Sequence, residues 1–184
     1  MTTRSPADAR PVVAFWQAAG EKGDWFSKNP EFDKRFRDRF LDLHCAAARR
    51  ECDGWIAEPD GALALMILLD QYPRNAFRDT AHMYATDPLA RLFARRAQAA
   101  GHMRRFDGDI RLFFCLPFAH SEALADQDVS VALNSVLGEP WTSHAEGHRD
   151  IIRRFGRFPH RNFILDRETT AEEADFLKHG GFAG

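Results

Sequence analysis

Proline placed directly after a capping side chain marks where helices begin in this chain. Three such pairs occur: Ser5-Pro6, Asn29-Pro30 and Asp87-Pro88. The Ser, Asn or Asp side chain accepts bonds from the free N–H groups of the first turn. Proline fits the first helical position because it has no N–H to satisfy. No window shows the strict alternation of a half-buried strand, so the chain is expected to be all-α.

Apolar residues at helical spacing indicate how far the helices extend. Phe32, Phe36, Phe40 and Leu43 recur at intervals of three and four, which predicts a helix from Pro30 to about Asp53. The sequence Thr170-Ala171-Glu172-Glu173 has the pattern of a capping box that opens a final helix, with Gly180 as its left-handed cap. This final helix is predicted to reach residue 179. Further helices or apolar helical segments are predicted over residues 61–71, 88–101, 107–118, 121–138 and 142–155, with a short turn over residues 79–83.

These elements predict a single all-helical domain over residues 1–184. About seven to eight helices joined by short turns favour antiparallel helix pairs stacked in a solenoid-like, tetratricopeptide-like array, with a closed bundle as the alternative. The chain has 184 residues, of which 45% are hydrophobic and 28% charged, enough for one substantial core.

Composition also limits the partners. The net charge of -2 gives no overall basic field, so we expect no nucleic-acid partner. No apolar run approaches the roughly 20 residues that span a bilayer, so we expect no membrane partner and a cytoplasmic protein. Cys45, Cys52 and Cys115 fit reduced thiols in that compartment. The sequence does not indicate an oligomeric state.

Two stretches share one unusual motif. Residues 70–78 read Asp-Gln-Tyr-Pro-Arg-Asn-Ala-Phe-Arg, and residues 157–165 read Arg-Phe-Pro-His-Arg-Asn-Phe-Ile-Leu. In each, an aromatic residue and proline follow an apolar helical run, and Arg-Asn comes next. Proline removes a donor and disfavours the α conformation in the residue before it, so both helices are predicted to end there.

The two motifs allow two interpretations. In the first interpretation their polar side chains are structural, with each arginine tying a carboxylate to a helix end. Alternatively they line a cleft that binds a small anionic ligand or a peptide segment, in which case the binding residues are Asp70, Arg74, Asn75, Arg78, Arg157, Arg161 and Asn162.

A hydrolase-type enzyme at the same cleft is the second functional hypothesis. His120, Glu122 and His160 are its acid–base candidates, because a histidine near a carboxylate titrates near neutral pH. Glu122 and Asp126 are predicted to share one helix face.

A metal site has only weak support. His144 and His148, which are four residues apart, are weak candidates for metal ligands, so neither a metal nor another cofactor is expected. No phosphate-loop, dinucleotide or serine-hydrolase motif is present.

Four longer motifs carry a family resemblance: Leu69–Arg78, Ala85–Ala90, Leu116–Glu122 and Arg154–Asn162. With them, the chain from Phe15 to Leu177 resembles the bacterial family catalogued as domain of unknown function family 924. The resemblance implies an all-helical, tetratricopeptide-like fold. It implies no activity, so it assigns no catalytic residue. One departure is Asp166, where the family pattern has a glycine.

Overall fold

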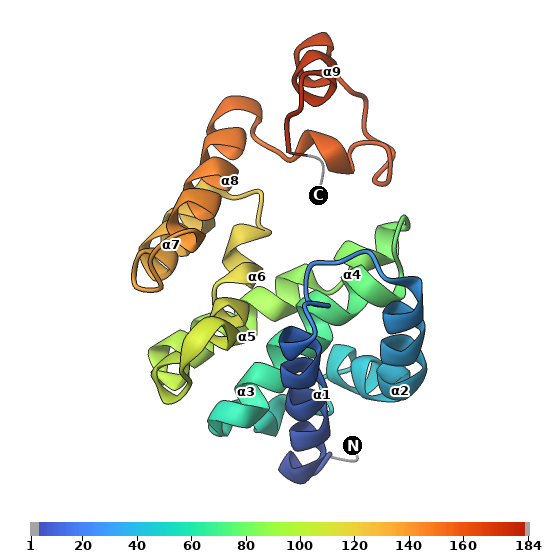
Figure 1. Ribbon diagram of the computed structural model, residues 1–184, viewed down its shortest axis with the longest axis vertical. Coiled ribbons are helices and arrows are strands. Elements are labelled where there is room, and N and C mark those ends of the chain that lie inside the picture. Colours follow the sequence, from blue (N-terminus) through green and yellow to red (C-terminus); the bar gives the residue numbers. More distant parts are fainter. Residues whose placement is uncertain (1–3, 183–184) are drawn as a thin grey trace. The chain divides into compact units, whose positions relative to one another are not determined.

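The chain folds into two compact units of helices. The computed structural model describes residues 4–182 (Figure 1). Its first unit comprises residues 4–78 and 82–117, and its second comprises residues 79–81 and 118–182. Every regular element in this described part is helical, which confirms the all-α prediction. The tetratricopeptide-like array and the single domain both stay predictions.

Nine α-helices lie within residues 4–182, and short turns of 3₁₀ or π geometry connect several of them. The α-helices are α1 Arg10–Glu21, α2 Pro30–Ala48, α3 Pro59–Met66, α4 Tyr72–Ala76, α5 Asp87–Ala99, α6 Leu116–Ala119, α7 Leu124–Ser135, α8 Trp141–Phe155 and α9 Ala171–Lys178. The 3₁₀ turns are η1 Pro6–Ala9, η2 Asp53–Ala57, η4 Ala81–Tyr84, η5 His102–Arg105, η6 Gly108–Phe114 and η7 Pro159–Arg161, and η3 Ile67–Gln71 is π-helical.

Most of the predicted helix starts are present. The Ser5 hydroxyl accepts a bond from the Ala7 N–H at the start of η1, and the Asn29 side chain caps α2. The capping box of Thr170 and Glu173 opens α9 as predicted. Asp87 differs, because it is the first residue of α5 and its carboxylate binds an arginine instead of capping the helix.

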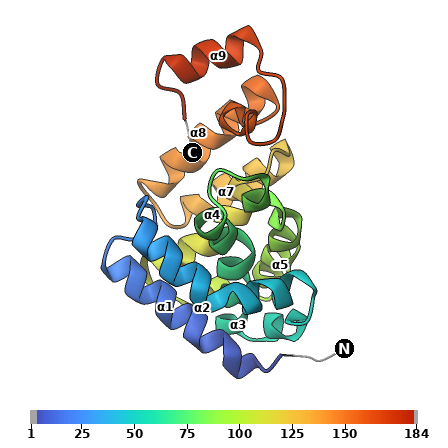
Figure 2. The ribbon, with the colours of Figure 1, turned by 90° about the vertical axis from the view of Figure 1, so that its right-hand side faces the viewer.

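Aromatic rings fill the core of the first unit. Phe15 on α1 stacks on Phe32 and Phe36 of α2, with ring centroids 5.6 and 5.3 Å apart, and Figure 2 shows these two helices side by side. The fully buried Trp16 meets Phe113 of η6 edge to face at 5.2 Å. These contacts anchor α1 and α2 to the rest of the unit.

The first Pro-Arg-Asn motif lies inside a continuous helical segment and not at a helix exit. In η3 the Tyr72 N–H bonds to the carbonyl of Ile67, five residues back, and α4 then continues through Pro73. Proline normally breaks a helix interior because it lacks the N–H and crowds the carbonyl four residues back. The wider π turn provides the space for it. The prediction that Pro73 ends this helix is therefore wrong.

Side chains from distant segments bond the carbonyls around this π turn. His44 Nδ1 lies 2.8 Å from the Leu68 carbonyl oxygen, and the Thr86 hydroxyl donates to the Leu69 carbonyl. Burial lowers the pKa of His44, and because a carbonyl oxygen can only accept, Nδ1 carries the proton in this bond. Buried backbone carbonyls need such partners wherever the helical ladder is interrupted.

The second unit is built on α7 and α8, which lie side by side (Figure 1). Helix α8 ends at Gly156, which has the left-handed φ of +68° that favours glycine. Pro159 then opens η7, and Phe158 packs with Ile151 and Ile152 in the core of this unit. The helix thus ends before the second Pro-Arg-Asn motif, and Pro159 is not what stops it.

In the described residues, no helix combines the length and the apolar character that crossing a bilayer requires.

Candidate functional site

Arg74 of the first motif is held between two buried carboxylates of its own unit. Its guanidinium forms a two-point bond with Asp87, at 2.8 and 3.0 Å, and lies 3.2 Å from Asp70 Oδ1. It also donates to the Asp70 backbone carbonyl at 2.7 Å. Burial would lower the pKa of the Arg74 guanidinium, but Asp70 and Asp87 outweigh burial and raise it. This arrangement joins α5 to the π turn.

Arg78 and Asn75 extend the same set of bonds. Arg78 forms a two-point ion pair with Asp33 on α2 and donates to the Asn75 side-chain oxygen at 2.9 Å. The Asn75 amide in turn donates to the Gln71 carbonyl at 2.9 Å. The polar residues of the first motif therefore brace α2, α4 and α5 against one another.

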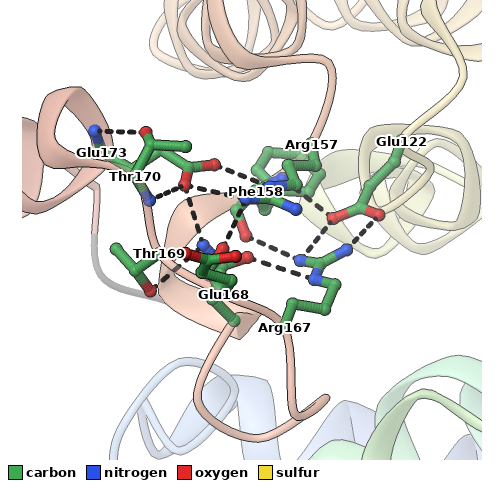
Figure 3. A network of polar contacts seen from close by, with 9 residues as sticks. Glu122, Arg157, Phe158, Arg167, Glu168, Thr169, Thr170 and Glu173 are labelled. Carbon is green, nitrogen blue, oxygen red and sulfur yellow. Dashed lines mark hydrogen bonds and ion pairs between the residues drawn. The ribbon is translucent and has the colours of Figure 1, made fainter.

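The second motif makes a similar network in the second unit, drawn in Figure 3. Arg157 forms a two-point ion pair with Glu173, at 2.7 and 2.9 Å, and donates to the Glu168 carbonyl. The Asn162 amide also donates to Glu173 Oε2, at 3.2 Å. The Arg157 bond lowers the pKa of the buried Glu173 carboxyl to about 2. Arg157 and Asn162 thus tie the segment after α8 to the first turn of α9.

Glu122, a predicted acid–base residue, is engaged in a second ion pair of this network. Arg167 donates to both of its oxygens, at 2.8 and 3.1 Å, and the Phe158 N–H donates to it at 2.8 Å (Figure 3). Burial would raise the pKa of Glu122, but these donors outweigh burial and lower it.

The predicted helix face shared by Glu122 and Asp126 is not present, because α7 begins only at Leu124. Asp126 instead accepts a bond from Ser121.

Three histidines and one arginine of the second unit form what we call the histidine–arginine cluster: His120, His148, His160 and Arg161. Burial, and after it interactions with His120, Arg161, His144 and His160, lower the pKa of His148 to about 3. Burial and then Arg161 and His120 lower the pKa of His160 to about 4, and Arg167 acts in the same direction. Glu122 opposes this shift at His160. The local field is therefore positive, and the two imidazoles are neutral at pH 7.

Aromatic rings surround this cluster. The ring of Phe158 lies 5.6 Å from those of both His148 and His160, and the Arg161 guanidinium lies over the same ring at 4.6 Å. Phe182 completes the set, with its ring 4.6 Å from His148 and 5.1 Å from His160. The Nδ1 atom of His160 is buried and has no hydrogen-bond partner in the described part of the chain.

The weak metal candidates lie in different surroundings. His148 is half-buried in the cluster, whereas His144 is exposed on the same helix and its ring lies 6.1 Å from that of Trp141. Within residues 4–182, no group of three or more His, Cys, Asp or Glu side chains has an arrangement that would hold a metal ion.

Sequence reasoning missed several partners of the predicted residues. Arg78 is held by Asp33, Arg74 by Asp87 and Glu122 by Arg167. These partners lie 45, 13 and 45 residues away along the chain, respectively. Phe182 was missed because a lone aromatic residue after a helix carries no pattern. Glu173 was identified only as part of a capping box, although that position also placed its carboxylate near the helix start.

Comparison with known proteins identifies the family. The chain is similar to a protein of unknown function from Agrobacterium tumefaciens whose structure is solved, with 56% identity over 95% of this chain and 98% of that chain and a TM-score of 0.92. No curated protein matches it. The model of a family described as bacterial proteins of unknown function matches residues 12–181. The chain therefore belongs to this bacterial family of unknown function, DUF924.

Proposed function

We propose that this protein binds a small anion at the histidine–arginine cluster of its second unit. The observation that carries the proposal is the buried Nδ1 atom of His160, which has no hydrogen-bond partner in the described residues. Buried polar atoms are almost always bonded, so an exception calls for an explanation such as a bound molecule. The neighbouring residue Arg161 is 6% exposed, and its guanidinium supplies a permanent positive charge.

The charges around His160 favour an anion over a cation. Arg161, Arg167 and His120 all lower its pKa, which means that they act on it as positive groups. Glu122 is the negative group among those that shift this pKa, and Arg167 already holds it in a two-point bond. An anion placed at His160 would accept a hydrogen bond from the imidazole and be attracted by the Arg161 charge.

The other arginines of the two motifs have better support as structural braces. Arg74, Arg78 and Arg157 each make two-point bonds with a carboxylate of their own unit. A ligand binding to one of these guanidiniums would have to displace a carboxylate from its two-point bond, which is costly. We therefore place the proposed site at His160 and its neighbours in the histidine–arginine cluster, and we favour a small anion over a peptide segment.

A hydrolytic role for His120, Glu122 and His160 has less support. General acid–base catalysis works best when the pKa of the catalytic group lies near the working pH. His160 has a pKa of about 4, and the Glu122 carboxylate is held ionised by Arg167 and the Phe158 N–H. Both groups are thus poor proton donors at neutral pH.

We also propose a cytoplasmic location. The support is that Cys45, Cys52 and Cys115 are free thiols, as is usual in a reducing compartment.

Sulfate is the probe for the proposed site, because its charge is constant with pH. Sulfate stabilises many proteins without binding, so the informative quantity is the difference between variants in the rise of the melting temperature. Arg161→Gln removes the charge at the site, and Arg154→Gln removes an exposed charge from the same unit as a matched control. The proposal predicts an equal rise for the wild type and Arg154→Gln and a smaller one for Arg161→Gln. Equal rises in all three would contradict it.

His160→Gln provides a second variant if Arg161→Gln does not fold. The wild type can also be titrated directly by calorimetry. Saturable binding that His160→Gln weakens would support the site. Binding that is absent in the folded wild type would refute it.

A further inference from the structure

The ring of Phe182 covers the histidines of the proposed anion site. It meets His148 and His160 edge to face, with interplanar angles of 70° and 83°, and its centroid lies 6.5 Å from that of Phe158. Although it touches three rings, the residue is still 42% exposed. A large apolar side chain held in this way is in contact with the site without being part of the buried core.

A tight turn at the end of α9 directs Phe182 to this position. Gly180 has a left-handed φ of +83°, and its N–H bonds to the Leu177 carbonyl. The Gly181 N–H bonds to the Phe176 carbonyl at 2.9 Å, so the pair of bonds is that of a helix C-cap. A Cβ atom on Gly181 would lie 2.5 Å from the Phe176 ring, which is too close without a shift. Both glycines are therefore needed for the chain to turn back at this point.

The site thus offers two kinds of contact next to each other. On one side are the Arg161 guanidinium and the His160 imidazole, which suit an anionic group. On the other are the edges and faces of His148, Phe158 and His160, which a flat ring contacts in the geometry that aromatic pairs prefer. The second side is now occupied by Phe182.

Building on the proposed anion site, we propose that the natural ligand is an anion that carries a flat apolar ring, and that this ring takes the place of the Phe182 ring. In the absence of a ligand, the Phe182 ring occupies the position that the ligand's ring would take. Phe182 moves out of this position when the ligand binds. Because Phe182 competes for this position, the apparent affinity is the intrinsic affinity multiplied by the fraction of molecules in which Phe182 has left the site.

Two sulfonates test this inference, because they share the anionic group and differ in the ring. Methanesulfonate lacks the ring and benzenesulfonate carries it. Their affinities are measured by NMR titration of the imidazole signals in the wild type, in Phe182→Ala and in Phe163→Ala. Phe163, which is 94% exposed in the same unit, provides the matched control for loss of a phenyl ring.

The inference predicts that benzenesulfonate binds more tightly than methanesulfonate to every form. It also predicts that Phe182→Ala tightens benzenesulfonate by about tenfold and leaves methanesulfonate unchanged, because only the ring competes with Phe182. Phe163→Ala should behave as the wild type.

The outcomes separate this inference from the function on which it rests. If both sulfonates bind with equal affinity, or if Phe182→Ala weakens benzenesulfonate, the ring preference is refuted and the anion site stands. If neither sulfonate nor sulfate binds to any form, the proposed anion site fails, and the inference fails with it.

Discussion

The Arg74 guanidinium bonds both oxygens of Asp87 while it also lies 3.2 Å from Asp70 Oδ1, so one buried cation contacts two buried carboxylates. Asp70 belongs to the π turn η3, and Asp87 is the first residue of α5. The stability of the first unit therefore depends on a single side chain that links two separate elements.

Arg74→Leu should lower the free energy of unfolding by about 3–5 kcal/mol, because it removes the cation that two buried carboxylates contact. Urea unfolding measures the loss. Lys34→Ala is the control, since it breaks the exposed ion pair with Asp38 and should cost less than about 1 kcal/mol. A loss for Arg74→Leu as small as that of the control would show that Arg74 is not a brace.

Glu173→Gln should lower the free energy of unfolding by about 2–4 kcal/mol. The change weakens a buried ion pair with Arg157 and the capping box of α9 together. The neighbouring Glu172 forms an exposed ion pair with Arg154, so Glu172→Gln is a matched control that should cost less than about 1 kcal/mol. Similar losses for the two variants would argue against the network of Figure 3.

Asp166→Gly should stabilise the protein by up to about 1 kcal/mol. Asp166 has a φ of +51°, in the left-handed region where glycine has no steric cost. Asp166→Val should instead cost about 1–2 kcal/mol, because a β-branched residue is poorly accommodated at positive φ. Thermal unfolding of both variants checks the order, and a valine variant as stable as the glycine variant would contradict the backbone geometry.

The protein should lose stability between pH 6.5 and about 4. His148 and His160 have folded pKa values of about 3 and about 4, below the ordinary value of 6.5. In this window the unfolded chain binds more protons than the folded one, so stability falls as the pH falls. Each histidine contributes up to about 1.4 kcal/mol per pH unit.

Urea unfolding at pH 7 and pH 5 measures this dependence. His148→Gln should reduce the difference between the two pH values, because it removes a group whose folded pKa of about 3 lies below the ordinary value. A dependence that His148→Gln does not change would show that this imidazole titrates normally in the folded state.

Local signals in the sequence predicted well where helices occur. They did not predict which side chains from distant segments contact those helices. Asn29 and Thr170 cap the helices that they were expected to cap, because capping involves only residues within one turn. Pro73 was expected to end a helix, since the rule for proline considers only its own helix. The π turn that accommodates it is bonded by His44 and Thr86, which lie 24 and 17 residues from the carbonyls they contact.

The candidate site shows the same limit. His120, Glu122 and His160 were predicted as acid–base residues and Arg161 as a binding residue. Their roles differ because Arg167 binds Glu122, while His160 keeps a buried nitrogen without a partner in the described residues. That division depends on which side chains meet across the fold, and spacing along the chain does not encode it.

The most direct test of the proposed function is the pKa of His160, measured by NMR of its imidazole nitrogens with and without saturating sulfate. An anion in contact with the ring stabilises its charged form, so the account predicts a clear rise from the value of about 4 in the free protein. Arg154→Gln should show the same rise, which separates binding at the cluster from binding at exposed arginines. A His160 pKa that sulfate leaves unchanged would contradict the anion site.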